Sequence, residues 1–292
     1  MFATVMQTMR IPFLILTPVC ILLGVAVSAS QLFFSIDILV ALLGAMAAHI
    51  SVNMLNEYQD FSSGLDLVTE RTPFSGGSGG LPAQPEAAHP VLWGAMGTLF
   101  LTIACGTYLA LQHPTLWPLG GAGSLLVLTY TRYLNRSPWL CLIAPGTGFG
   151  LLMVTGTTVV AGGGDTISIA SAVLVVFLLV NNLLLLNQFP DIAADAAHGR
   201  NHFLICYGVS AGIRAYGIST FAVAAVIVLT VMTGVWSQWV LLALIPWAAT
   251  LRTITLLNQL RENIAQRPEA LGLNVLATLL TPLVAAIALL LA

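Results

Sequence analysis

Long apolar stretches separated by short polar segments run through the whole chain. A helix that crosses the hydrocarbon core of a bilayer needs roughly 20 predominantly apolar residues, with a range of about 17–25. The pattern therefore predicts nine membrane-spanning helices, and the Gly and Pro residues inside them are tolerated in membrane helices. The predicted spans are residues 12–29, 33–56, 91–111, 115–131, 139–160, 168–189, 212–234, 237–257 and 271–291.

The cationic residues provide a test of this count, because all nine are Arg and, with nine spans, all fall on one side of the membrane. Cytoplasmic segments carry the excess of positive charge in membrane proteins, so this side is predicted to be cytoplasmic. We expect a multi-pass protein of the cell (inner, cytoplasmic) membrane, with its N-terminus inside and its C-terminus outside. The arginines are Arg10, Arg71, Arg132, Arg136, Arg200, Arg214, Arg252, Arg261 and Arg267.

Composition agrees with an all-α chain embedded in lipid. The 292 residues are 58% hydrophobic and only 7% charged, whereas soluble domains carry roughly 25% charged residues. The formal net charge of −2 excludes a nucleic-acid-binding protein, which needs a basic face. Residues 1–292 are interpreted as a single domain in the bilayer, and nothing in the sequence indicates an obligatory protein partner.

Two long polar segments, residues 57–90 and 190–211, lie on the predicted cytoplasmic side, whereas the opposite loops are short. Long loops in a compact protein are often functional, so the chemistry is expected to face the cytoplasm. Each of these segments follows a predicted span that ends in polar residues.

The span 33–56 and its continuation carry a narrow polar stripe. His49, Asn53, Asn56 and Asp60 fall within an arc of about 60° on a helix with 3.6 residues per turn. Polar groups are costly in lipid, so this stripe should face the interior of the bundle. Taken alone, His49 and Asn53 are better explained by a structural role, in which they hold helices together or cap them.

The span 168–189 ends in a matching pattern, in which Asn187 is followed four residues later by Asp191 and then by Asp195. With Asn181 and Gln188, these residues cover an arc of about 120°. Both patterns therefore present an Asn, an Asp four residues later and a further Asp, Asp66 in the first case, at the cytoplasmic end of a helix.

Facing carboxylates repel strongly in a low-dielectric site and are tolerable when cations lie between them. Carboxylate and amide oxygens suit Mg²⁺, which is usually held by a few carboxylates together with substrate phosphates. We therefore predict a Mg²⁺ site that binds a diphosphate substrate, with cytoplasmic arginines neutralising its remaining charge. The predicted metal ligands are Asp60, Asp66, Asp191 and Asp195, and the predicted diphosphate-binding residues are Arg10, Asn53, Arg71 and Arg200.

These motifs resemble those of the UbiA-type intramembrane prenyltransferases. The first reads NEYQDFSSGLD over residues 56–66, with Glu57 in place of the usual Asp and the last Asp displaced by two positions, to Asp66. The second reads NQFPDIAADAAHGR over residues 187–200. The displaced Asp is similar to the MenA-like branch, which transfers prenyl chains to 1,4-dihydroxy-2-naphthoate.

The resemblance implies an all-helical bundle around a central cavity with a cytoplasmic cap. It implies a Mg²⁺-dependent transferase in which the diphosphate leaves and an aromatic acceptor captures the allylic cation, in menaquinone-type biosynthesis. Tyr130 matches a recurring Tyr of the family and is expected either to shield the cation with its ring face or to be an aromatic residue at the membrane interface. The expected catalytic residues are Asn56, Asp60, Asp66, Tyr130, Asn187, Asp191 and Asp195.

The sequence leaves several alternatives open. Leu142 stands where the family commonly has an acidic residue, so a phenolic acid, a tetrapyrrole or a polyol lipid is an alternative acceptor. The glycines of residues 71–80 either let backbone N–H groups approach phosphate or form a flexible linker. A membrane transporter is the rival from another class, but its ionisable residues would be expected near the midplane rather than at one end of two helices.

The one-sided arginines predict the topology. A reporter inserted after residue 80 should be found in the cytoplasm, and a reporter fused to Ala292 should be found outside. Accessibility of single-cysteine labels in intact cells and in inverted vesicles measures both positions. A C-terminal reporter found inside the cell would contradict an odd number of spans.

Overall fold

The computed structural model describes residues 1–30, 35–69, 71–72 and 74–292, and within these ranges the chain is helical and contains no β-strand. The predicted all-α membrane bundle is therefore confirmed. Residues 33 and 34 of the predicted span 33–56, and Pro73 of the glycine-rich segment, lie outside the described residues.

Seven helical segments in the described ranges are long and apolar enough to cross a membrane. The chain is a multi-pass membrane protein. The segments are α3 (Ile36–Ser62), η3 with α5 (Pro85–Gln112; α5 is Ala88–Gln112), α7–η5–α8 (Pro138–Val160), α9 (Thr166–Asn187), α12 (Val209–Met232), η6–α13–α14–η7 (Gln238–Gln266; α14 is Ala249–Leu260) and α15 (Pro268–Leu290).

Two further apolar segments depart from this simple form. Helix α1 (Phe2–Thr8) and the helix Ile11–Ala26, which ends in α2 (Leu16–Ala26), count as one span only if their bend of 44° is accepted. The bend lies at Arg10, whose φ of 53° is left-handed and ends the first helix. Helix α6 (Leu116–Thr129) has 14 residues, about 21 Å at 1.5 Å per residue, which is short of a full crossing.

The nine predicted spans each overlap one of these helical segments, but the count of nine is not confirmed. The described residues contain seven spans, or eight with the bent pair, together with the shorter α6. The sequence also gave no sign of α1, or of the short helices inside the two polar segments. Those short helices are α4 (Gly80–Ala83), α10 (Ile192–Ala197) and α11 (Phe203–Tyr207).

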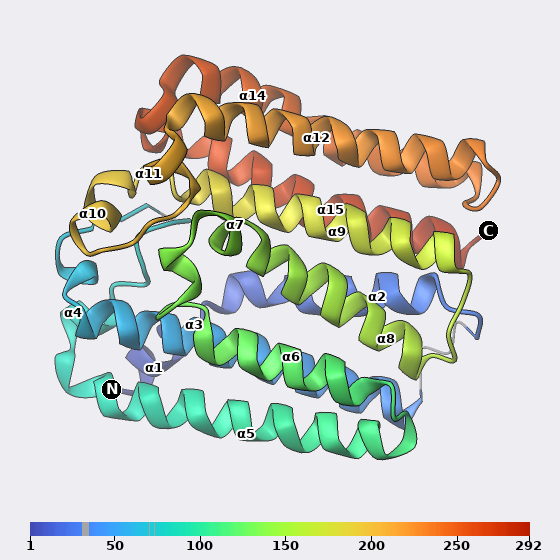
Figure 1. Ribbon diagram of the computed structural model, residues 1–292, viewed down its shortest axis with the longest axis horizontal. Coiled ribbons are helices and arrows are strands. Elements are labelled where there is room, and N and C mark those ends of the chain that lie inside the picture. The colour runs from blue at the N-terminus through green and yellow to red at the C-terminus, as the bar shows by residue number, and fades with distance from the viewer. Residues whose placement is uncertain (31–34, 70, 73) are drawn as a thin grey trace.

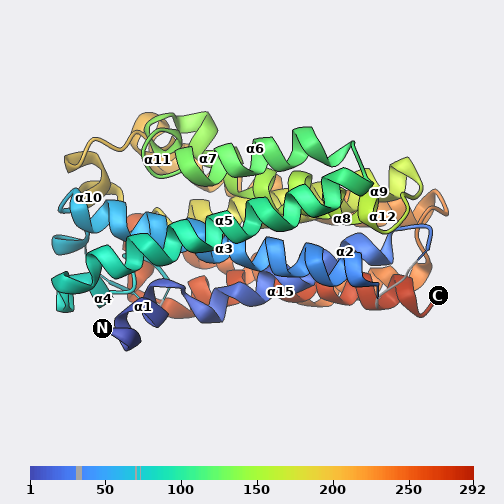
Figure 2. The same cartoon turned by 90° about the horizontal axis from the view of Figure 1, so that it is seen from below.

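The long helices lie side by side along one direction, as Figures 1 and 2 show. Helices α4, α10 and α11 gather at the end where the N-terminus lies, and the C-terminus lies at the opposite end (Figure 1). The last turn of α3, with Asp60, reaches the same end as α10 (Figure 1). We call this end the acidic end.

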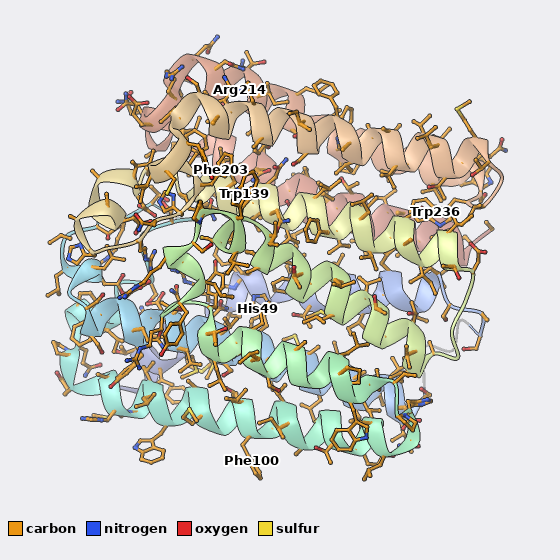
Figure 3. The ribbon with its side chains drawn as sticks, viewed as in Figure 1. His49, Phe100, Trp139, Phe203, Arg214 and Trp236 are labelled. Atoms are coloured by element: carbon orange, nitrogen blue, oxygen red, sulfur yellow. The ribbon has the colours of Figure 1, made fainter. Side chains whose placement is uncertain are left out.

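The outer surface of the bundle is apolar. Phe100 on α5 is 74% exposed and points away from the bundle (Figure 3), and Ile218 and Met232 on α12 are similarly exposed. Such a surface is stable only against lipid. The core surrounds α9, which packs against α2, α12 and α15.

Polar side chains bind the core helices to one another. Asn182 Nδ2 on α9 donates to the Tyr216 carbonyl at 3.0 Å and to Thr220 Oγ1 at 3.1 Å, both on α12. Tyr216 in turn donates from its hydroxyl to Asn274 Oδ1 on α15 at 2.8 Å. Hydrogen bonds of this kind support helix association in membranes, where the hydrophobic effect cannot.

The irregular segment η5 (Thr147–Val154), a π-helix, packs closely on α9. It follows Pro145, which cannot donate a backbone hydrogen bond. The N–H of the next residue, Gly146, donates to Asn181 Oδ1 on α9 at 2.6 Å. Asn181 therefore holds two helices together rather than facing a ligand. A Cβ on Gly150 would lie 2.7 Å from the backbone oxygen of Val173.

Two glycine substitutions separate the effect of helix packing on stability from the effect of helix propensity. Gly150→Ala should lower the melting temperature in detergent by several degrees, because its Cβ meets backbone atoms of α9 that cannot yield, and overpacking costs typically 1–3 kcal/mol. Gly97→Ala on α5 is the matched control, since nothing lies within 4 Å of its added Cβ and Ala favours helix by about 1 kcal/mol. Equal melting temperatures for the two variants would contradict this packing.

Candidate active site

A cavity of about 220 Å³ opens inside the acidic end, and we call it the polar chamber. It brings the two acidic motifs together from α3 and from the segment that follows α9. All but one of the predicted site residues line it. These are Arg10, Asn53, Asn56, Asp60, Asp66, Tyr130, Asn187, Asp191, Asp195 and Arg200.

Arg71 is the predicted residue that does not line the polar chamber. Its side chain is directed to the backbone of Asp66, with Nη2 3.4 Å from the carbonyl oxygen. The residue itself is exposed. In this arrangement Arg71 supports the loop that carries Asp66 and does not face the space where a diphosphate would lie.

Arg200 connects the two motifs. Its Nη1 donates to Asp195 Oδ1 at 3.0 Å, and its Nη2 forms an ion pair with Asp60. His202 Nε2 lies 3.1 Å from the other oxygen of Asp195. The turn that places Arg200 depends on Gly199, whose φ of 75° favours glycine, and on the Asn201 N–H, which donates to the Asn135 carbonyl at 3.1 Å.

Among the described residues, the other two chamber aspartates, Asp66 and Asp191, form no ion pair, and burial is the main influence on their pKa values. Desolvation, followed by repulsion from Asp60, raises the pKa of Asp66 to about 7. Desolvation, followed by repulsion from Asp195, raises the pKa of Asp191 to about 7. Both carboxyls are therefore protonated for part of the time near neutral pH, and a cation in the chamber would favour their charged forms.

Several chamber oxygens have no hydrogen-bond partner among the residues that the structure describes. Asp66 Oδ2, Asn187 Oδ1 and Gln188 Oε1 are buried and unpaired, which is costly for a buried polar atom. Within the described ranges no three acidic, His or Cys side chains stand close enough to hold an ion by themselves. The oxygen-rich donors fit Mg²⁺, whose coordination is commonly completed by substrate phosphates and water.

Glu57, the unusual residue of the first motif, does not line the chamber. It is 1% exposed and accepts hydrogen bonds from Arg10 Nε at 2.9 Å and from the N–H and hydroxyl of Ser78 at 2.8 and 2.7 Å. Glu57 thus anchors the glycine-rich loop.

The anchored loop forms part of the chamber wall through Ser75, Gly76 and Gly77. Gly77 has a φ of 75°, and a Cβ at this position would lie 2.9 Å from Asp66 Oδ1. Only glycine allows the backbone to approach this carboxylate so closely. In this structure residues 75–77 therefore form part of the chamber wall beside Asp66.

Sequence reasoning missed two chamber residues. Cys141, in the apolar run of the predicted span 139–160, is buried but faces the chamber, where it accepts from Gln188 Nε2 at 3.1 Å and lies 3.4 Å from Asn135 Oδ1. Its neighbour Leu142 packs instead in a hydrophobic cluster behind the wall. The second is His202, which lines the chamber beside Asp195.

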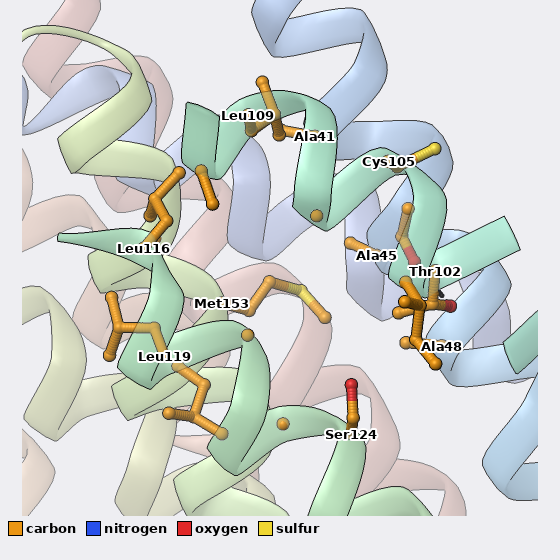
Figure 4. Close-up of a pocket in the computed structure, with 18 of the residues that line it drawn as sticks. Ala41, Ala45, Ala48, Thr102, Cys105, Leu109, Leu116, Leu119, Ser124 and Met153 are labelled. Atoms are coloured by element: carbon orange, nitrogen blue, oxygen red, sulfur yellow. Dashed lines mark hydrogen bonds between the residues drawn. The ribbon is translucent and has the colours of Figure 1, made fainter. Parts of the chain in front are cut away.

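A second, larger cavity of about 440 Å³ adjoins the polar chamber, and we call it the apolar chamber. It lies between α3, α5, α6 and the α7–η5–α8 segment, with walls of small and aliphatic side chains (Figure 4). Ala41, Ala45 and Ala48 on α3 face Leu116 and Leu119 of α6 across it (Figure 4). Its composition suits a hydrocarbon chain.

Comparison with known proteins agrees with this architecture. Residues 17–276 match the UbiA prenyltransferase family, so the chain belongs to this family. A search of curated proteins by sequence finds no match.

Solved structures share the fold across almost the whole chain. A UbiA homolog from Archaeoglobus fulgidus bound to DMAPP and Mg²⁺ has a TM-score of 0.71 at 12% identity, covering 99% of both chains. A digeranylgeranylglyceryl phosphate synthase gives 0.68 at 14% identity, covering 98% of both. A UbiA homolog from Aeropyrum pernix K1 gives 0.66 at 16% identity, covering 96% of this chain and 98% of the other.

The raised pKa values predict that the metal-free protein loses stability as pH rises. The folded state binds protons on Asp66 and Asp191 more tightly than the unfolded state does. Their contribution to the free energy of unfolding is therefore full below pH 3.8, the ordinary pKa of Asp, and declines as the pH rises to about 7. The melting temperature in EDTA should fall by several degrees between pH 5 and pH 8, and Asp66→Asn should flatten this slope.

The matched control is Asp165→Asn, which changes a helix-capping carboxylate on α9 and keeps a residue that caps well. It should retain the wild-type slope, and Mg²⁺ should restore stability at pH 8 in the wild type. The same slope in Asp66→Asn as in the wild type would contradict the assignment.

Proposed function

We propose that this protein transfers a polyprenyl group from a prenyl diphosphate to an aromatic quinone precursor, with 1,4-dihydroxy-2-naphthoate the first candidate. The observation that carries this proposal is the juxtaposition of a chamber lined by two acidic motifs with an apolar chamber. A prenyl diphosphate has the same division, since a dianionic or trianionic head is joined to a hydrocarbon chain.

The acidic end would hold the diphosphate head. Asp60, Asp66, Asp191 and Asp195 would hold Mg²⁺ together with the diphosphate oxygens, and the metal would supply Lewis-acid stabilisation of the leaving group. Arg10 and Asn53 line the same chamber and provide donors for the phosphate oxygens. The binding of DMAPP and Mg²⁺ by the Archaeoglobus fulgidus homolog supports this assignment.

Arg200 takes part by exchanging partners. In the ligand-free chamber its guanidinium neutralises Asp60 and Asp195. With Mg²⁺ and a diphosphate bound, the carboxylates would have another partner, and the guanidinium would be free to bind phosphate oxygens, for which its planar fork is well suited. Arg200 would then neutralise carboxylates in one state and phosphate oxygens in the other.

The aromatic acceptor is proposed from the sequence. The displaced Asp66 and the second motif resemble the MenA-like branch, and the chamber lies at the end of the bundle predicted to face the cytoplasm, where a water-soluble acid would enter. Tyr130 lines the polar chamber, where its ring could shield a developing allylic cation.

Two substitutions test the metal assignment. Asp60→Asn and Asp191→Asn should each lower Mg²⁺-dependent turnover by about 100-fold or more, since each removes a charged ligand at the leaving group. Asp165→Asn, at the opposite end of α9, should keep wild-type turnover. Near-wild-type activity in either chamber variant, measured on folded protein in detergent, would show that the metal lies elsewhere.

The acceptor is tested by direct product analysis. Purified protein is incubated with labelled geranylgeranyl diphosphate, Mg²⁺ and, in parallel, 1,4-dihydroxy-2-naphthoate, 4-hydroxybenzoate and glycerol 1-phosphate, and the lipid products are identified by mass. Prenylated dihydroxynaphthoate supports the proposal. Product from another acceptor alone overturns the acceptor assignment, and product from glycerol 1-phosphate would place the protein with polyol-lipid synthases.

A further inference from the structure

The polar and apolar chambers meet at a common boundary. Their walls share five residues, namely His49, Val52, Leu126, Gly148 and Phe149. His49 is the titratable one among these five. The boundary is the place where a polar head and an apolar tail must join.

On the proposed function, the boundary is also the place of the chemistry. The reacting carbon of a prenyl diphosphate, C1, connects the diphosphate oxygen to the hydrocarbon chain. With the head in the polar chamber and the tail in the apolar chamber, C1 lies where the two walls meet. Any nucleophile that attacks C1 has to reach this boundary.

His49 lies inside the bundle (Figure 3), and two neighbouring side chains hold its ring in position. Its Nδ1 lies 2.9 Å from Thr17 Oγ1 on α2, and its ring packs edge-on against Phe149 with centroids 4.8 Å apart. The residue is 7% exposed. On α3 it lies two turns, about 10 Å, deeper than Asn56 and thus beyond the diphosphate-binding residues.

The second ring nitrogen of His49, Nε2, is available to a ligand. Nε2 makes no hydrogen bond with the described part of the chain, whereas Nδ1 is paired with Thr17. In the tautomer that donates from Nδ1 to the Thr17 oxygen, Nε2 carries the lone pair and accepts a proton. A fixed orientation set by a hydrogen bond to the other nitrogen is what a general base requires.

We propose that His49 is the catalytic base of the transfer, an inference that rests on the proposed function. The bond between C1 and the diphosphate oxygen breaks, and its electron pair leaves with the diphosphate. The attacking atom, an aromatic ring carbon or a water oxygen, gives an electron pair to C1 and forms the new bond. The proton on the attacking atom passes to His49 Nε2, and in the aromatic case this loss restores the ring. The proton moves from Nε2 to water when the products leave.

Other ionisable groups of the two chambers are placed differently. Asp60 and Asp195 are paired with Arg200 at the acidic end, and Tyr130 lines the polar chamber but not the apolar one. Cys105 lines the apolar chamber but not the polar one. None of them stands at the boundary.

The test separates breaking of the C1–O bond from capture of the cation. Geranylgeranyl diphosphate carrying ¹⁸O at the bridging position is incubated with protein and Mg²⁺. Scrambling of the label into non-bridging positions reports ionisation without needing an acceptor. Capture is measured as prenylated product with 1,4-dihydroxy-2-naphthoate, and as prenyl alcohol, from water, when no acceptor is added.

His49→Gln should scramble the label at close to the wild-type rate while the ratio of capture to scrambling falls about 100-fold or more, the usual contribution of a general base. Gln preserves a hydrogen bond to Thr17 but does not titrate. Thr17→Val, which removes the orienting partner, should give an intermediate ratio. Ser51→Ala, a buried α3 residue bonded to the Ala95 carbonyl and outside both walls, is the matched control and should leave the ratio unchanged.

Three results would overturn the inference in distinguishable ways. A wild-type ratio in His49→Gln excludes His49 as the base and leaves the proposed function intact. A parallel loss of scrambling and capture in folded His49→Gln assigns the residue to substrate binding. If the wild-type protein neither scrambles nor consumes the diphosphate, the proposed function fails and this inference fails with it.

Discussion

Mutual repulsion among buried carboxylates is the constraint around which the acidic end is built. Four aspartates reach one small chamber from two segments that are distant in sequence, residues 60–66 and 191–195, and in a low-dielectric setting such charges cannot stand together unneutralised. Arg200 neutralises two of them, and burial keeps the other two partly protonated near neutral pH. The net charge of the four carboxyl groups is thereby kept low.

The supporting contacts serve this arrangement. Glu57 fixes the glycine-rich loop through Ser78, and Gly77 lets that loop lie against Asp66. Asn53 and Arg10 tie the N-terminal segment to α3, since Asn53 donates to the Met9 carbonyl at 3.0 Å. Pieces that are separated by tens of residues thereby form one wall.

The division into a polar and an apolar chamber restricts how an elongated substrate can be oriented inside the protein. A substrate with a charged head and a hydrocarbon tail can lie in it in only one orientation, because the reverse would bury charge among alkyl groups. Helix α3 runs along both chambers and carries alanines in the apolar one and the His49 to Asp60 stripe toward the polar one. In the proposed function, the register of this single helix would therefore set where the head, the reacting carbon and the tail of the substrate lie.

The sequence by itself determined the membrane-embedded helical fold and the pairing of the two acidic motifs. Hydrophobic length and the cost of polar groups in lipid are local properties, so each predicted span overlaps a helix and most predicted site residues meet in one chamber. The number of helices that cross the membrane fully was harder to predict from the sequence. The left-handed backbone at Arg10 and the short length of α6 both depend on tertiary packing.

Only the tertiary structure decided which side chains face the chambers. Periodicity shows that residues share a face of a helix, but it does not show which neighbour that face meets. Glu57 belongs to the motif and yet turns toward Ser78, whereas Cys141 belongs to an apolar run and yet faces the polar chamber beside the π-helical segment η5. The role proposed for His49 rests on the meeting of α2, α3 and η5 around one ring, contacts between residues far apart in the chain that no local pattern encodes.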